Sequence, residues 1–231
     1  MTKYFILFFF SATAFSAELL TNCARFSDVP KWVNLSRVNR IADSVTRIME
    51  WDIRRVEVQW YQNQKEFESV HSLGPMALAV TQRGQNRILL GPKVIDSNFD
   101  RVFGHELVHI TSAQKYKDAI PKWLEEGMAN HIANFGKVDY KTMLKRPLPK
   151  DVTKMIHPMS GNDQDILNHY MTSQALAEML SARCDFRNLL RLSVQRKMED
   201  YLEKVCRISD INQTFQKWVS DQALTQNKAK K

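Results

Sequence analysis

Two histidines and a glutamate stand at a spacing that suits metal-assisted hydrolysis. The stretch from 104 to 110 reads GHELVHI, so His105 and His109 are four residues apart and Glu106 follows the first. On a helix, side chains four residues apart project from the same face, about one turn from each other. Two imidazoles placed in this way suit a tetrahedral Zn²⁺, and Glu106 is placed to take a proton from water at the metal's open position.

A second stretch just downstream, residues 121–129, reads PKWLEEGMA. Pro121 suits the first turn of a helix, where its missing N–H has no cost. A carboxylate from this second helix would complete a His₂Glu site, the catalytic type that leaves one position for water. The small residues Gly127 and Ala129 predict a close approach of this helix to the first one. The alternatives are two solvated histidines, or a chance motif with odds of roughly one in a hundred.

Together the two stretches resemble the gluzincin metallopeptidases, whose pattern is H-E-x-x-H followed by W-L-x-E-G-x-A, and most closely the small peptidase MA-like family. The resemblance covers about residues 55–219 and is concentrated in the two metal stretches. It implies that the third zinc ligand is Glu126, directly before the glycine, and not Glu125.

The same resemblance implies that Tyr170, on a helix expected from 169 to about 182, points its hydroxyl into the cleft. A phenol donor there can stabilise the oxyanion of a tetrahedral intermediate. The alternative is a tyrosine that only packs at a helix N-terminus, and His169 beside it is a lesser candidate for the same task.

Asn130 lies one helical turn after Glu126, where some gluzincins have an acidic residue that hydrogen-bonds a ligand histidine. Its amide oxygen can accept that bond, but it adds no charge. His131 points about 140° away from Glu126 on a helix, so we expect it on the surface or in a packing role.

Residues 1–17 have the composition of a secretory signal peptide. Lys3 precedes an unbroken apolar run from 4 to 10, and residues 14–16 fit an A-x-A-like cleavage site. The apolar run is too short to span a bilayer. We therefore expect a secreted or periplasmic protein. A lipoprotein box at Cys23 is the less favoured alternative, because Asn22 is bulky where such boxes carry a small residue.

The three cysteines, Cys23, Cys184 and Cys206, lack the C-x-x-C spacing of a zinc ribbon or a thioredoxin-like motif. In an oxidising compartment two of them can pair. Cys184 and Cys206 are the preferred pair because both lie in the predicted helical C-terminal region, and three separate thiols are the alternative. The net charge of +8 is spread along the chain without a nucleic-acid-binding motif. We expect general attraction to anionic envelope surfaces and no nucleic-acid partner.

Length and composition predict one globular domain with a sizeable core. The expected fold class is α+β and zincin-like, with a small N-terminal mixed sheet, the H-E-x-x-H helix and a helical C-terminal half over residues 18–221. Residues 222–231 are expected to form a polar tail. Beyond the two metal stretches, helices are predicted at 35–49, 65–70, 169–182, from 186 and from 208, strands at 56–60, 76–80 and 87–91, and loops at 140–149 and 158–164.

The sequence thus predicts an exported zinc metallopeptidase that acts on a peptide or protein substrate. Glu106 is the expected general base and later the proton donor to the leaving amine. One alternative is a catalytically silent, zinc-stabilised binding or assembly module of the cell envelope. Another is a helical envelope protein without metal. Metal analysis distinguishes the last from the other two, and Glu106→Gln distinguishes the enzyme from the silent module.

Overall fold

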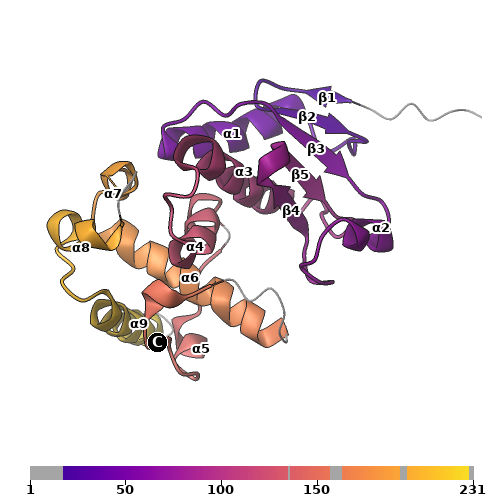
Figure 1. The fold of residues 1–231 in the computed structure, drawn as a ribbon. Coiled ribbons are helices and arrows are strands. Elements are labelled where there is room, and N and C mark those ends of the chain that lie inside the picture. The colour runs from indigo at the N-terminus through magenta and orange to yellow at the C-terminus, as the bar shows by residue number, and fades with distance from the viewer. Residues whose placement is uncertain (1–17, 135, 157–162, 193–196, 229–231) are drawn as a thin grey trace, which may run out of the picture.

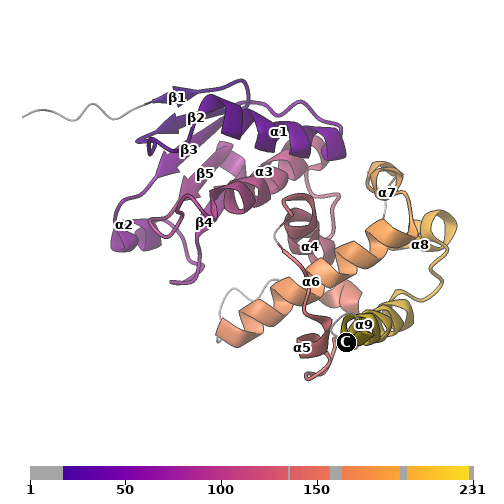
Figure 2. The same cartoon turned by 180° about the vertical axis from the view of Figure 1, so that it is seen from behind.

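The computed structural model describes residues 18–134, 136–156, 163–192 and 197–228. Within them the chain forms an α+β fold, in which a five-stranded mixed sheet is followed by a mostly helical remainder (Figures 1 and 2). The predicted signal peptide and most of the loop predicted at 158–164 lie outside the described residues. Within those ranges, no helix combines the length and the apolar character needed to cross a bilayer.

The sheet has the strand order β1-β2-β3-β5-β4. Its three inner strands are mutually parallel, and the two outer strands, β1 and β4, run antiparallel to their neighbours. The edge strand β4 therefore has one side free of strand partners among the described residues. The strands are β1 (Leu19–Leu20), β2 (Ala24–Ser27), β3 (Val56–Trp60), β4 (Ala79–Gln82) and β5 (Arg87–Leu90).

The hairpin between β4 and β5 sets the register of the edge strand. The short 3₁₀ helix η1 (Arg83–Gln85) and Asn86, whose φ is 50°, reverse the chain. Asparagine tolerates this left-handed conformation better than most residues, which suits Asn86 to the end of the turn. The strand predicted at 76–80 is wrong in its bounds. It lies at Ala79–Gln82 because Gln82 pairs with Arg87 across this turn.

Two helices pack beside the sheet, α1 (Leu35–Met49) and α3 (Phe99–Tyr116), and the short α2 (Gln64–Ser69) lies near the β4 end (Figure 1). The predicted helix is present, and its apolar positions Val38, Ile41 and Val45 are buried at helical spacing, whereas Leu35 at its start is exposed. On α3, Phe103 stacks on Phe99 and lies 5.2 Å, centroid to centroid, from Phe26 of β2. The Arg37 guanidinium pairs with Asp100, which fixes α1 against the start of α3.

The remainder is helical and differs from the prediction in several places. The helix predicted at 169–182 begins at Asp163, within the predicted loop at 158–164, and a 3₁₀ helix at 152–154 was not predicted. The expected loop at 140–149 contains a short helix, and α8 was not predicted. The expected polar tail continues α9, because Phe215, Val219 and Ala223 recur every four residues and are buried. The helices are α4 (Lys122–Ile132), α5 (Tyr140–Met143), η2 (Val152–Lys154), α6 (Asp163–Arg183), α7 (Phe186–Leu192), α8 (Glu199–Cys206) and α9 (Ile211–Lys228).

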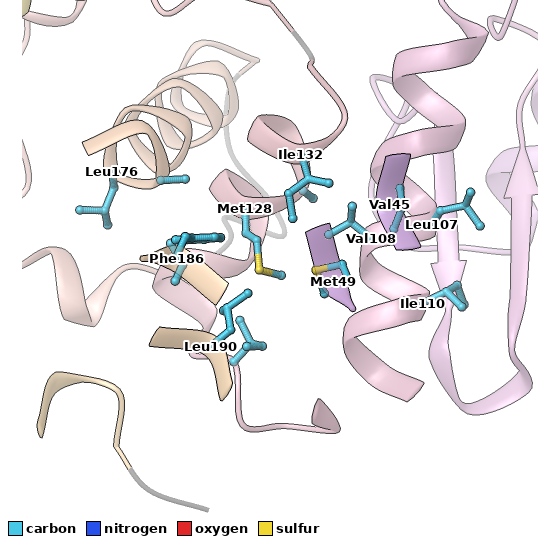
Figure 3. Close-up of a cluster of buried hydrophobic side chains, with 14 of the residues drawn as sticks. Val45, Met49, Leu107, Val108, Ile110, Met128, Ile132, Leu176, Phe186 and Leu190 are labelled. Carbon is cyan, nitrogen blue, oxygen red and sulfur yellow. The ribbon is translucent and has the colours of Figure 1, made fainter. Parts of the chain in front are cut away.

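The core continues from the sheet half into the helical half. Figure 3 shows Met49 of α1 and Val108 of α3 beside Ile132 and Met128 of α4, with Leu190 of α7 close by. All five side chains are buried. The helix that carries H-E-x-x-H is therefore enclosed by packing on more than one side, and this packing restricts the rotamers of its side chains.

Gly127 allows a close approach between two helices, but its partner is α6 and not α3. A Cβ built on Gly127 would lie 1.7 Å from the carbonyl oxygen of Ser173. Successive helical residues point about 100° apart. Because Glu126 faces α3, its neighbour Gly127 faces a different helix. The prediction that Gly127 brings α4 close to the first helix is wrong in its partner.

The preferred cysteine pairing is present. Cys184 and Cys206 form a disulfide that joins the region after α6 to the last turn of α8. Cys23 is a buried thiol outside any disulfide. Burial in apolar surroundings raises the pKa of Cys23, an effect that a hydrogen bond with Thr21 partly opposes.

Candidate metal centre

Helices α3 and α4 bring His105, His109 and Glu126 together. Each offers one ligand atom, and these atoms all lie within 4.8 Å of one another. Both histidines are buried, and the Glu126 side chain is 15% exposed. The sequence reasoning therefore named three residues that the structure gathers into one cluster, drawn from two helices that are separate in the sequence.

The spacing of the two imidazoles and the Glu126 carboxylate can be compared with a tetrahedral metal site. The two imidazole Nε2 atoms are 3.1 Å apart. Glu126 Oε2 lies 3.4 Å from His105 Nε2, and Glu126 Oε1 lies 3.5 Å from His109 Nε2. A tetrahedron with metal–ligand bonds of 2.0–2.1 Å has edges of about 3.3 Å. The two Glu126 contacts end on different oxygens of its carboxylate, and one atom from each of the three residues lies within 4.8 Å of the others. The three groups are therefore close enough for a zinc-sized ion to be bound after the side chains adjust.

Glu125 contacts the Nδ1 side of the His109 ring. Its Oε1 lies 3.2 Å from Nδ1 of His109, and its side chain is only 6% exposed. With the imidazole hydrogen on Nδ1, this carboxylate accepts it, and the Nε2 lone pair of His109 faces Glu126. Lone pairs from His109 and Glu126 then face each other, and a metal ion or a hydrogen-bond donor between them can satisfy both.

The pKa shifts of Glu126 and His105 show how the three groups of the cluster interact. Burial disfavours the charged form of Glu126, but the imidazoles of His109 and His105 outweigh it and hold the pKa of Glu126 well below its usual range. Burial likewise lowers the pKa of His105, yet the Glu126 carboxylate reverses the direction and raises it. Asn130, buried on α4, also favours protonated His105. The cluster attracts positive charge, be it a proton or a metal ion.

Glu106 is held by the edge strand of the sheet. The hydroxyl of Thr81, on β4, donates a 2.6 Å hydrogen bond to Oε2 of Glu106 and lies 3.3 Å from its backbone carbonyl oxygen. Glu106 is 7% exposed and is directly adjacent to the first ligand histidine. The hydrogen bond uses one of the carboxylate's lone pairs, so Glu106 keeps acceptor capacity for a proton from water.

Tyr170 lines a cavity that also contains His105, Glu106 and Asn130. The cavity has a volume of about 590 Å³. Burial, with the carboxylates of Glu126 and Glu106, raises the pKa of Tyr170 far above its ordinary value. The phenol therefore stays protonated at neutral pH and can act as a hydrogen-bond donor in the cavity.

The two other histidines near the site lie apart from the three ligand atoms. His169 is buried beside Tyr170, with ring centroids 6.1 Å apart. His131 contacts the Phe186 ring edge-on at 6.3 Å, which confirms its predicted packing role. Neither imidazole belongs to the His105–His109–Glu126 cluster.

Sequence reasoning missed three residues that position the site: Thr81, Arg83 and the carboxylate of Glu125. Arg83 lies in η1 directly after the edge strand and pairs with Glu125. Thr81 and Arg83 belong to no motif, and their place depends on the register of the β4–β5 hairpin. Glu125 carried a signal, because an acidic residue beside a ligand on a buried helix requires partners of its own.

The sequence was also compared with models of known protein families and with curated proteins. No family model matches it, and no curated protein matches it significantly. The resemblance to the gluzincins therefore stays a prediction that rests on the two motifs.

Proposed function

We propose that this chain is a zinc-dependent peptidase of gluzincin type with a zincin-like fold. One observation carries the proposal above the others. Two imidazoles and a carboxylate offer ligand atoms within 4.8 Å of one another, and Glu106, which follows His105 in the sequence, lines a cavity together with His105. A metal site with three protein ligands and a neighbouring carboxylate is the arrangement that hydrolytic zinc enzymes use.

In this proposal His105, His109 and Glu126 hold the zinc. When bound, the metal supplies a Lewis acid that polarises a carbonyl and lowers the pKa of water. The Glu106 carboxylate accepts the proton of the attacking water and later gives it to the leaving amine, while the hydroxyl of Thr81 orients this carboxylate through Oε2. Tyr170 donates a hydrogen bond to the oxygen that becomes negatively charged.

The walls of the cavity indicate the substrate class. Apart from the polar groups near the cluster, most of the lining is apolar, and much of it comes from the segment before β4 and from α6. Pockets with apolar walls and few polar groups select apolar ligand groups. We therefore expect a peptide with a large apolar side chain next to the cleaved bond. The apolar lining includes Leu73, Met76, Leu78, Val102, Leu167 and Met171.

A second function, a zinc-stabilised module without turnover, shares the same metal cluster. The hydrogen bond between Thr81 and Glu106 favours the enzyme, because a silent module has no need to orient a carboxylate that binds no metal. Export to the envelope or beyond is a separate proposal that rests on residues 1–17 of the sequence.

The test is to purify the protein and measure zinc by elemental analysis, together with cleavage of a random peptide library. We expect about one zinc per chain, lost in His105→Ala, His109→Ala and Glu126→Ala. Removal of zinc with a chelator should abolish cleavage, and readdition should restore it. Glu106→Gln should keep zinc but lose about 10²–10⁴-fold in turnover. Zinc binding without any cleavage would favour the silent module, and absence of zinc would overturn the proposal.

A further inference from the structure

Arg83 reaches from the sheet half of the molecule to helix α4. It lies in η1, one residue after β4, and its guanidinium pairs with Oε1 of Glu125. The same oxygen faces Nδ1 of His109 at 3.2 Å. The Arg83 side chain is 32% exposed, whereas that of Glu125 is 6% exposed. The three groups thus form a chain from the edge of the sheet to a residue of the metal cluster.

A buried carboxylate in this position requires a cation. Taking an unpaired carboxylate out of water costs several kcal/mol, and contact with the imidazole N–H of His109 offsets only part of that cost. Lys122 also reaches Glu125, at 3.0 Å from Oε2, but its side chain is 63% exposed and its contact is screened by water. Arg83 is the less exposed of the two cations and contacts the oxygen that faces the histidine.

The orientation of His109 depends on that oxygen. A carboxylate at Nδ1 fixes the tautomer that leaves Nε2 free for the metal, and it makes the imidazole a stronger ligand. Burial lowers the pKa of Arg83, while Glu126, Asp118 and Glu106 oppose this effect. Arg83 is therefore surrounded by the acidic groups of the site, where a cation balances their charge.

We propose that Arg83 is a positioning residue for the metal centre, acting through Glu125 on His109. This inference rests on the proposed zinc site and adds a residue that lies outside both metal motifs. Arg83 does not contact the metal, so its effect appears in how tightly and in which geometry the metal is held. The edge strand that holds Glu106 through Thr81 thereby also helps to hold the ligand set.

The experiment measures zinc affinity by competition with a chromogenic chelator for the wild-type protein, Arg83→Gln, Arg83→Lys and Glu125→Gln. Loss of an outer partner of a ligand histidine typically weakens metal binding about 10–100-fold, and we expect this for Arg83→Gln and Glu125→Gln. Arg83→Lys keeps the charge and should recover part of the loss. The double variant with Arg83→Gln and Glu125→Gln should lose no more zinc affinity than about the larger of the two single losses. The reason is that both substitutions interrupt the same series of contacts from Arg83 through Glu125 to His109.

Lys122→Gln is the matched control, since it removes the exposed cation from the same carboxylate. It should weaken zinc binding by no more than about fivefold, as expected for a surface ion pair. The visible spectrum of the Co²⁺-substituted protein should change in Arg83→Gln and not in Lys122→Gln. Thermal unfolding of the metal-free variants checks that each one folds.

Arg83→Gln with wild-type zinc affinity and an unchanged Co²⁺ spectrum would overturn the inference, even if zinc binding itself is established. A raised KM in that variant with unchanged zinc affinity would do the same and would assign Arg83 to substrate binding. If the wild-type protein fails to bind zinc, the proposed function fails first. The two failures are therefore distinguishable.

Discussion

Replacing Thr81 by valine removes one hydroxyl from the site and keeps the shape of the side chain. That hydroxyl donates a 2.6 Å hydrogen bond to the Glu106 carboxylate, which is 7% exposed. Hydrogen bonds to charged groups contribute about 1.5–3 kcal/mol net. If the bond orients the general base in the transition state, its loss should lower kcat/KM about 10- to 150-fold, because each 1.36 kcal/mol corresponds to a factor of ten.

The assay is steady-state cleavage of one peptide found in the library, with zinc content measured in each preparation. Thr81→Ser keeps the hydroxyl and is the matched control, with an expected loss of less than about fivefold, since a hydrogen bond of similar strength re-forms. Zinc content should not change in either variant. In a background that already carries Glu106→Gln, the Thr81→Val effect should disappear, because both act through one carboxylate.

Two results would refute this reasoning. The first is wild-type kcat/KM in Thr81→Val, which would show that Glu106 is oriented without the hydroxyl. The second is an equal loss in Thr81→Ser and Thr81→Val, which would assign the effect to the methyl group or to strand β4 and not to the hydrogen bond.

Three further predictions concern other parts of the molecule. Tyr170→Phe should lower kcat about 10²–10³-fold with little change in KM, because the hydroxyl is needed only when negative charge develops; a wild-type rate would assign Tyr170 to packing. Gly127→Ala should cost about 1–3 kcal/mol and lower Tm by about 2–12 °C, because the new Cβ overlaps the backbone of Ser173; unchanged thermal unfolding would contradict the close contact. Burial lowers the pKa of His131, opposed by Glu178, so the unfolded chain binds a proton there more readily. The free energy of unfolding should therefore fall as pH drops below about 6.5. Urea unfolding of the metal-free proteins at pH 7.5 and 5.5 measures this fall, which should be smaller in His131→Phe than in the wild-type protein.

The parts of the fold set by local pattern could be predicted from the sequence. The i, i+4 spacing of His105 and His109 depends only on the geometry of one helix. The same holds for the helix at 35–49 and the strand at 56–60. In each of them, the spacing of apolar residues within the element itself indicates which face is buried.

The missed parts depend on pairing between distant segments or on weak local signals. Strand β2 was not predicted because it is only four residues long and contains the charged Arg25. Its alternating pattern of burial rests on two residues alone, Ala24 and Phe26. The roles of Thr81 and Arg83 follow from hairpin register and from the way β4 lies beside α3, which no local pattern specifies. The partner of Gly127 depended on the placement of α6, about 45 residues away in the chain.

Glu126 and Gly127 are neighbours in the sequence, but substitution at each position is restricted for a different reason. A saturation mutagenesis library can distinguish the two reasons. At position 127 any side chain larger than hydrogen meets the backbone of α6, so every substitution should cost stability, and selection for folded protein alone should reject the larger side chains. At position 126 the same selection should accept many residues, because the role proposed for the carboxylate there is metal binding and not packing. Selection for turnover should then reject them. Two independent constraints therefore act on adjacent positions of this stretch: a steric one on Gly127 and, in the proposed function, a chemical one on Glu126.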